Sequence, residues 1–202
     1  TPSNALSGMS AECRTKQPLP SSGALRTNGS MQYQLTKISE IRRVAPGYAA
    51  LTFTGQRPVS GEPGQFVMIR GNWGSDPILP RAFSLVASGA SGVVLVRDVG
   101  KGTSLLCHMK PGDDLFVLGP LGNTWTLPSA DRTAVLVAGG VGVAPLVFLA
   151  RELKRSGIPT RFLFGARTAD DLPLREDIED ICTLHVTTED GSVGHRGLVT
   201  DL

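Results

Sequence analysis

The chain has 202 residues, of which 41% are hydrophobic, so it can bury a sizeable core and, at roughly 100 to 200 residues per domain, is expected to form two small domains. Its 20 Lys and Arg nearly balance its 18 Asp and Glu, which argues against a polyanion-binding surface and hence against a nucleic-acid partner. The longest uncharged stretch, residues 133–150, is broken by glycines and a proline, so no membrane span is expected.

The cysteines at positions 13, 107 and 182 lie far apart, without the C-x-x-C pairs of a zinc site or the even number of a disulfide framework. They are typical of free thiols in a reducing compartment, so we expect a cytoplasmic protein without a metal site. His108 directly follows Cys107, which suits neither a metal pair nor a nucleophile and base on one helical face. We interpret both residues as structural.

Residues 1–30 are rich in Ser, Pro, Gly and Thr and show no apolar period, which predicts a disordered extension or an expression remnant. A targeting peptide is the alternative, disfavoured because this segment lacks an apolar h-region. The patterned part of the chain is therefore expected to begin at Met31.

Residues 31–128 contain six short segments in which apolar and polar residues roughly alternate. Pro-Gly pairs at 46–47, 63–64 and 111–112 mark three of the breaks between them. This pattern predicts an antiparallel, six-stranded barrel.

Residues 129–202 show a different pattern, in which buried strands alternate with helices. The expected elements are a strand over 133–140, a helix over 144–157, a strand over 161–167, a short acidic helix over 174–180 and a strand over 183–190. Such alternation predicts a parallel sheet, here with only three strands. The fold class expected is thus a β-barrel followed by an α/β unit that is incomplete at its C-terminus.

A glycine-rich turn links the first strand and helix of this second part, and it contains Gly140 and Gly142 but has Pro145 where G-x-G-x-x-G would place a third glycine. Glycines permit close approach of the backbone, and the helix amides beyond them can hold phosphate. Proline is favourable in the first turn of a helix. The motif alone also fits a plain strand-to-helix turn.

The barrel part supplies a second motif, 80-PRAFSL-85. Alternation on a strand places Arg81 and Phe83 on one face, where the guanidinium can pair with a pyrophosphate and the ring can stack. Ser84 offers a further hydrogen bond. An ordinary edge strand is the alternative interpretation.

The third motif is 100-GKGTSLLCHMKPGD-113, in which Gly102 frees the backbone and Thr103 is a favourable N-cap. A helix over 104–110 would then point its positive end at an anion. The alternative is a capped surface helix without a ligand.

Together, in this order, the three motifs resemble the ferredoxin reductase superfamily, in which a flavin-binding barrel with an R-x-[YF]-S motif precedes a nicotinamide-binding domain that opens with G-x-G-x-x-P. PGQF at 63–66, GARTADDL at 165–172 and TEDGSVGHRGLVTD at 188–201 look more closely like the electron-transfer subunit of class 1B dihydroorotate dehydrogenase. The resemblance covers roughly residues 31–202. Related subunits of ferredoxin:NADP oxidoreductases of the bifurcating type share it.

The resemblance implies an FAD-binding barrel over 31–128 and an NAD-binding domain over 129–202. It places the FAD pyrophosphate at Arg81, the isoalloxazine at Phe83 and its N5 region at Ser84, with phosphate held by Gly102 and Thr103. Ala82 stands where the subfamily often has Pro, and Trp125 where it has Phe. Neither change removes a charge or a donor, so flavin binding is expected to survive.

The function implied is flavin-dependent electron transfer between a nicotinamide cofactor and a partner redox subunit, as in pyrimidine biosynthesis, in a hetero-oligomer with a catalytic dehydrogenase subunit. Because the flavin carries the chemistry, no catalytic side chain is expected. The alternatives are a subunit of the bifurcating type and a flavin- or nucleotide-binding module without turnover.

The preference between NAD and NADP depends on two rules that conflict here. Arg167 would accept a 2′-phosphate in a Rossmann domain. In this superfamily, however, the adenosine end is usually read after the third strand, where Glu189 and Asp190 would repel a phosphate dianion. We therefore expect NAD, with NADP as the alternative.

Relatives of this kind also carry a [2Fe–2S] centre, which normally needs four protein ligands, whereas this chain has three scattered cysteines. We therefore expect no cluster in this chain, and a fragment or truncated homologue in which FAD binding persists. Nicotinamide binding is expected to be weak and electron delivery to a partner to fail.

Overall fold

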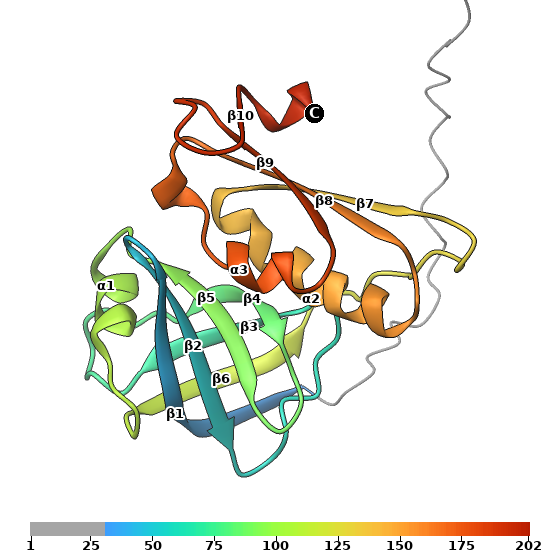
Figure 1. Ribbon diagram of the computed structural model, residues 1–202. Coiled ribbons are helices and arrows are strands. Elements are labelled where there is room, and N and C mark those ends of the chain that lie inside the picture. The colour runs from blue at the N-terminus through green and yellow to red at the C-terminus, as the bar shows by residue number, and fades with distance from the viewer. Residues whose placement is uncertain (1–30) are drawn as a thin grey trace, which may run out of the picture.

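The computed structural model describes residues 31–202; the extension predicted over residues 1–30 lies outside them. The chain forms a β-barrel and then a parallel sheet with helices (Figure 1). The connection between them, residues 122–133, contains the expected boundary at 128/129. That boundary stays a prediction.

The first unit is a closed antiparallel barrel with strand order β1-β2-β5-β4-β3-β6, which confirms the six-stranded prediction. Its strands are β1 (Gln32–Ala45), β2 (Tyr48–Gly55), β3 (Phe66–Gly71), β4 (Arg81–Ala87), β5 (Gly92–Arg97) and β6 (Asp114–Leu121). β1 closes the barrel because its first half pairs with β6 and its second half with β2. Alternate side chains such as Leu51, Ile69 and Leu115 are fully buried and fill the interior.

Helix α1 (Lys101–His108) lies outside the barrel between β5 and β6 and begins earlier than the predicted 104–110. Its N-cap is Gly100, so the prediction of Thr103 as N-cap is wrong. Thr103 is the third helical residue, and its hydroxyl accepts hydrogen bonds from the N–H groups of Val99 (3.0 Å) and Gly100 (3.1 Å). A glycine cap has no side chain, so the sequence favoured the nearest threonine.

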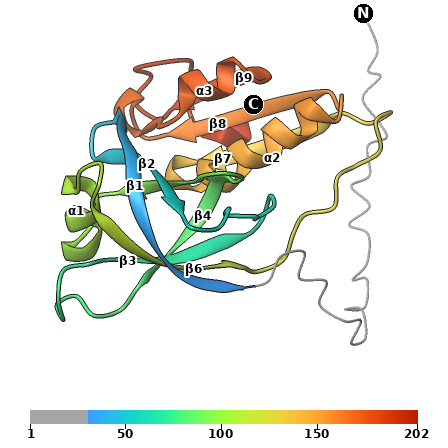
Figure 2. The ribbon, with the colours of Figure 1, turned by 90° about the horizontal axis from the view of Figure 1, so that it is seen from below.

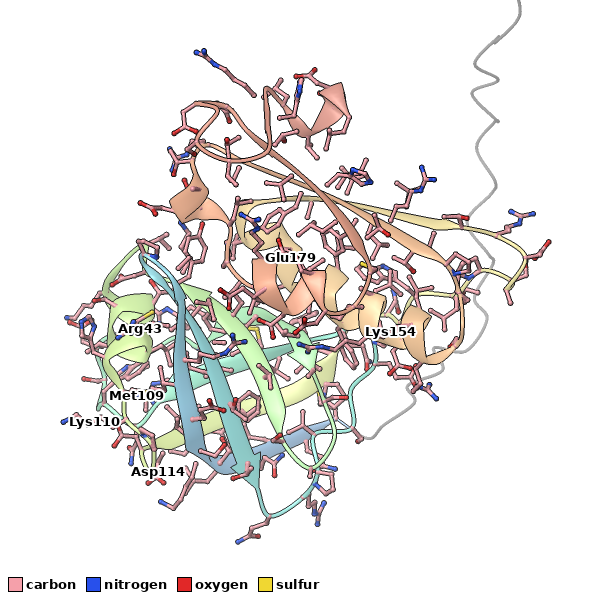
Figure 3. The ribbon with its side chains drawn as sticks, viewed as in Figure 1. Arg43, Met109, Lys110, Asp114, Lys154 and Glu179 are labelled. Carbon is pink, nitrogen blue, oxygen red and sulfur yellow. The ribbon has the colours of Figure 1, made fainter. Side chains whose placement is uncertain are left out.

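A hydrogen bond from β1 ties the C-terminal end of α1 to the barrel wall. Arg43 on β1 donates from Nη2 to the carbonyl of Cys107 at 2.6 Å (Figure 3). Cys107 is 1% exposed and belongs to the barrel core, and burial raises the pKa of its thiol. The helix is therefore held firmly at its C-terminal end.

The second unit is a parallel sheet with strand order β10-β9-β8-β7. Its strands are β7 (Ala134–Gly139), β8 (Thr160–Ala166), β9 (Thr183–Thr188) and β10 (His195–Arg196). The sheet has four strands, so the prediction of three strands is wrong because it missed β10. β10 is only two residues long, too short to show a period, and pairs His195 and Arg196 with the end of β9.

Helices α2 (Val143–Arg155) and α3 (Arg175–Glu179) lie on the face of the sheet that is turned toward the barrel (Figure 1). The C-terminal ends of the two helices are linked by Lys154 of α2, whose Nζ donates to the carbonyl of Asp180, the C-cap residue of α3, at 2.7 Å (Figure 3). On β7, Leu136 is buried against this layer, whereas Val135 and Val137 point to the other face and are 56% and 50% exposed.

One of the two buried hydrophobic clusters contains side chains of both units, whereas the other lies mainly inside the barrel. Helix α2 lies beside β4 of the barrel (Figure 2). The buried cluster around α2 includes four side chains of the barrel, Tyr48, Ala50, Val86 and Leu95. Between residues 31 and 202, no helix has the length and apolar character that crossing a membrane requires.

Candidate functional site

Two residues predicted to bind the flavin phosphates, Arg81 and Gly102, lie in direct contact. A Cβ added at Gly102 would lie 2.2 Å from Cζ of Arg81, so only a glycine leaves room for the guanidinium there. Arg81 begins β4 and also donates from Nη1 to the carbonyl of Leu79. The arrangement holds a cation against the N-terminal turn of α1.

That N-terminal turn presents backbone N–H groups for which the helix itself has no acceptor. Gly100, Lys101, Gly102 and Thr103 form it, and Lys101 makes an ion pair with Asp76 that ties the turn to the loop before β4. The N–H of Gly100 is bonded to the Thr103 hydroxyl, which leaves the amides of Lys101, Gly102 and Thr103. These amides, the helix dipole and a guanidinium together suit a phosphate group. The residues present therefore fit a dinucleotide pyrophosphate.

The remaining residues predicted to bind flavin, Phe83 and Ser84, follow Arg81 along β4 and are both half-buried. Phe83 packs against the edge of the barrel core, and Ser84 lies opposite Phe66 on β3. Ala82, between Arg81 and Phe83, is exposed. One strand thus carries a cation, a ring and a hydroxyl within a single stretch.

The glycine-rich turn lies at the carboxyl end of β7. Gly140 has a φ of +49°, a left-handed conformation that favours glycine. Gly142 ends a short 3₁₀ turn (Gly140–Gly142), and Pro145 is the third residue of α2, within its first turn as expected. A Cβ at Gly142 would meet no atom within 4 Å, which leaves open space beside the first turn of α2.

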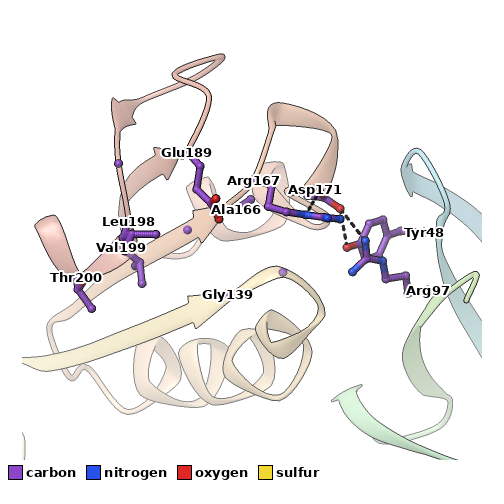
Figure 4. Close-up of a pocket in the computed structure, with 13 residues that line it drawn as sticks. Tyr48, Arg97, Gly139, Ala166, Arg167, Asp171, Glu189, Leu198, Val199 and Thr200 are labelled. Atoms are coloured by element: carbon purple, nitrogen blue, oxygen red, sulfur yellow. Dashed lines mark hydrogen bonds and ion pairs between the residues drawn. The ribbon is translucent and has the colours of Figure 1, made fainter.

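A pocket of about 420 Å³ lies at the carboxyl ends of β7, β8 and β9 (Figure 4). Three of the residues predicted to bind nicotinamide line it, namely Gly140, Arg167 and Glu189. Ligands of parallel α/β sheets bind at this edge, beyond the carboxyl ends of the strands. The residues that line this pocket could therefore hold a nucleotide.

The two acidic residues after β9 differ in what they contact. Glu189 lines the pocket, whereas Asp190 turns away and accepts hydrogen bonds from Ser192, through its N–H at 2.9 Å and its hydroxyl at 2.7 Å. These bonds lower the pKa of Asp190. Of these two acidic residues, Glu189 is thus the one that faces the pocket, with Arg167 also in its lining.

Curated proteins of related sequence identify the family. The chain is 36% identical over 172 residues to the electron transfer subunit of dihydroorotate dehydrogenase B (NAD(+)) from Clostridium acetobutylicum, covering 84% of this chain and 67% of the relative. The chain belongs to the family of dihydroorotate dehydrogenase B electron transfer subunits. The member from Geobacillus kaustophilus is 40% identical over 146 residues, which cover 70% of this chain and 57% of that relative. No protein-family model matches the chain.

Solved structures share the fold of this chain. An NADH-dependent reduced ferredoxin-NADP oxidoreductase, described for flavin-based electron bifurcation, matches with a TM-score of 0.73 and 31% identity over 82% of this chain and 60% of its own. The ferredoxin reductase of carbazole 1,9a-dioxygenase matches with a TM-score of 0.75 and 21% identity over 85% of this chain and 56% of its own. The fold is thus ferredoxin reductase-like.

The pocket in this family member also contains residues that were not predicted to bind the nucleotide, although Asp171 and residues 197–200 lie within the quoted motifs. They are Tyr48 and Arg97 from the barrel, Asp171 after β8, and the segment 197–200. Tyr48 and Arg97 face each other across β2 and β5, a pairing that becomes visible only once the register is known. Among residues 31–202, no group of three His, Cys, Asp or Glu side chains is placed to hold a metal ion.

Proposed function

We propose that this chain binds FAD on its barrel and NADH at the carboxyl edge of its sheet, and that it supplies these two sites to an electron path that leads to a catalytic dehydrogenase subunit. Delivery to that subunit is expected to fail with this chain alone, because its three scattered cysteines cannot ligate a [2Fe–2S] centre. The contact between Arg81 and Gly102 at the start of α1 carries the flavin part of this proposal. The relatives named for dihydroorotate dehydrogenase B support the partner and the link to pyrimidine biosynthesis.

A bound flavin would accept a hydride equivalent and release electrons one at a time. The chain's own residues bind and orient it: Arg81 and the amides of Gly102 and Thr103 hold the pyrophosphate, while Phe83 and Ser84 lie along β4 toward the ring. Hydrogen bonds to a charged group contribute about 1.5–3 kcal/mol each. Arg81 alone is therefore expected to account for roughly a tenfold to hundredfold factor in FAD affinity.

On the nucleotide side, Gly140, Gly142 and the first turn of α2 with Pro145 would receive the pyrophosphate of NADH. Arg167 and Glu189 would lie near the adenosine. We propose NAD rather than NADP because Glu189 opposes a 2′-phosphate and Arg167 already lies 3.5 Å from Asp171, measured from its Nε to Oδ2. Asp190, bonded to Ser192, contributes less to this choice.

The test is a titration of the purified apoprotein with FAD, followed by anaerobic reduction of the bound flavin with NADH or NADPH. We expect one FAD per chain, weaker FAD binding in Arg81→Gln, and faster reduction by NADH than by NADPH. A chain that takes up no FAD would refute the proposal. Reduction by NADPH as fast as by NADH would refute the cofactor preference alone.

A second candidate is a subunit of a bifurcating ferredoxin-NADP oxidoreductase, favoured by the 31% identity to such a structure. The two candidates share the cofactor sites and differ in the partner. Complex formation with a dihydroorotate dehydrogenase catalytic subunit decides between them, because it does not require electron delivery. A stable complex with this subunit in gel filtration supports the first candidate, whereas binding only to a glutamate synthase-like partner supports the second.

A further inference from the structure

One carboxylate, that of Asp171, joins the two units across the rim of the nucleotide pocket. Its Oδ1 accepts hydrogen bonds from Tyr48 Oη at 3.2 Å and Arg97 Nη2 at 3.1 Å, both from the barrel (Figure 4). Its Oδ2 lies 3.5 Å from Nε of Arg167 on its own side. Asp171 therefore has bonding partners in both units.

The two barrel donors are held rigidly. Tyr48 is 1% exposed, and Cζ of Arg97 lies 5.1 Å from the centroid of its ring, within the range of a cation–π contact. The carboxylate is also anchored, since Leu172 and Leu174 just after it are buried in the core that the units share. Asp171 thus lies between buried groups of the barrel and buried groups of its own unit.

A second carboxylate, Asp177, also bridges the units but lies outside the pocket. It pairs with Arg42 of β1 at 2.8 Å and with Arg151 of α2 at 3.3 Å. Arg42 is 46% exposed, so this pair is more strongly screened by solvent than the one at Asp171. Of the two bridges, only Asp171 both lines the pocket and joins the units.

We propose that Asp171 is a positioning residue for hydride transfer: by holding Tyr48 and Arg97 it fixes the nucleotide pocket relative to the barrel that binds the flavin. This inference rests on the proposed function. Because a displacement of about 1 Å at reacting atoms costs up to roughly a hundredfold in rate, a loosened junction slows flavin reduction without weakening FAD binding. Asp171 touches neither Arg81 nor Gly102.

The experiment compares Asp171→Asn and Tyr48→Phe with Asp170→Asn, a matched control that removes the same charge from the adjacent, exposed residue. Two quantities are measured: amide hydrogen exchange of residues 171–178, without nucleotide, and the rate constant of flavin reduction at saturating NADH. We expect both Asp171→Asn and Tyr48→Phe to speed exchange and to slow reduction, by about tenfold or more in Asp171→Asn. Asp170→Asn should match the wild type in both.

The double variant separates positioning from general destabilisation. If Tyr48 and Asp171 act through one bond, the losses in rate of the two single variants combine less than additively in free energy. Three outcomes would each overturn the proposal. The first is amide exchange in Asp171→Asn and Tyr48→Phe that equals the wild type, and the second is faster exchange with an unchanged rate of flavin reduction. The third is that the losses in rate of the two single variants add fully in the double variant. If NADH fails to reduce even the wild type, the proposed function is wrong, while the exchange rates still decide whether Asp171 holds the units together. If Asp171→Asn does not fold, Tyr48→Phe carries the same comparison.

Discussion

The guanidinium of Arg81 occupies the space that a side chain at Gly102 would need, 2.2 Å from the position of its Cβ. Gly102→Ala therefore displaces Arg81 from the first turn of α1. Because Arg81 is flexible and solvent lies nearby, we expect little change in stability but a rise in the Kd for FAD of about tenfold to a hundredfold. Fluorescence titration of the apoprotein with FAD measures it.

Gly100→Ala is the control for this prediction, since an added Cβ at Gly100 meets no atom within 4 Å. FAD binding that falls equally in both variants would mean that crowding of the flavin, and not loss of Arg81, is responsible. Retention of wild-type affinity by Gly102→Ala would contradict the role of this contact altogether.

Gly140 and Gly142 allow two roles of glycine to be tested separately: a left-handed backbone conformation at Gly140 and room for a ligand to approach the backbone at Gly142. Gly140 has a positive φ of +49°, so Gly140→Ala is expected to cost about 1–2 kcal/mol in the free energy of unfolding. Gly142 has a φ of −63°, so Gly142→Ala should be neutral or stabilising by up to about 1 kcal/mol. If the pyrophosphate of NADH approaches this turn, Gly142→Ala still weakens NADH binding. Urea unfolding and NADH titration measure the two effects, and equal stability of both variants would contradict the first.

Glu189 and Asp190 offer a matched test of nucleotide preference. Glu189→Gln removes the carboxylate that lines the pocket and is expected to raise kcat/KM for NADPH relative to NADH by roughly twofold to tenfold, a modest factor because Glu189 is exposed. Asp190→Asn should change this ratio less, because Asp190 is directed to Ser192. The reverse order of effects would show that Asp190 reads the nucleotide.

Tyr48 is expected to make the free energy of unfolding decrease as the pH rises in the alkaline range. Burial raises the pKa of its phenol above the ordinary value of 10.0, and Arg97 opposes this in part. The folded chain thus keeps the proton at a pH where the unfolded chain has lost it, so the stabilisation is complete below about pH 10 and is lost as the pH rises toward the folded pKa.

Tyr48→Phe is therefore expected to be less stable near neutral pH, by about 0.5–1.5 kcal/mol, because the bond to Asp171 is lost. Its stability should fall less steeply than that of the wild type above about pH 10. Urea unfolding of both proteins across this range measures the difference. Parallel pH profiles would show that Tyr48 does not titrate between the two states.

Much of the architecture was predictable because it depends on local patterns. The alternation of apolar and polar residues from Leu51 to Thr54 is typical of a barrel strand, and the apolar run before Gly140 predicted the strand that leads into the glycine turn. β10 escaped detection because two residues carry no period; His195 and Arg196 pair with β9 only because the chain returns there.

From local geometry alone, the site was predictable only where one segment carries the chemistry; the meeting of Arg81 with Gly102 was expected from the family resemblance. Arg81 and Phe83 share a strand, and Thr103 shares a turn with Gly102, so their proximity follows from local geometry. Asp171 meets Tyr48 across 123 positions of sequence, and nothing near either residue indicates the other. Such contacts depend on how the two units pack, which no local pattern encodes.

The shared core has a consequence for any attempt to recombine this protein. Tyr48, Val86 and Leu95 of the barrel are buried in one cluster with residues of the other unit, so a cut near residue 128 would expose apolar surface on both pieces. The barrel and the sheet are then not interchangeable modules. A chimera with the nucleotide domain of another protein would also need the barrel side chains that are complementary to that domain. Exchange of these domains in nature would then be confined to pairs whose packing surfaces changed together.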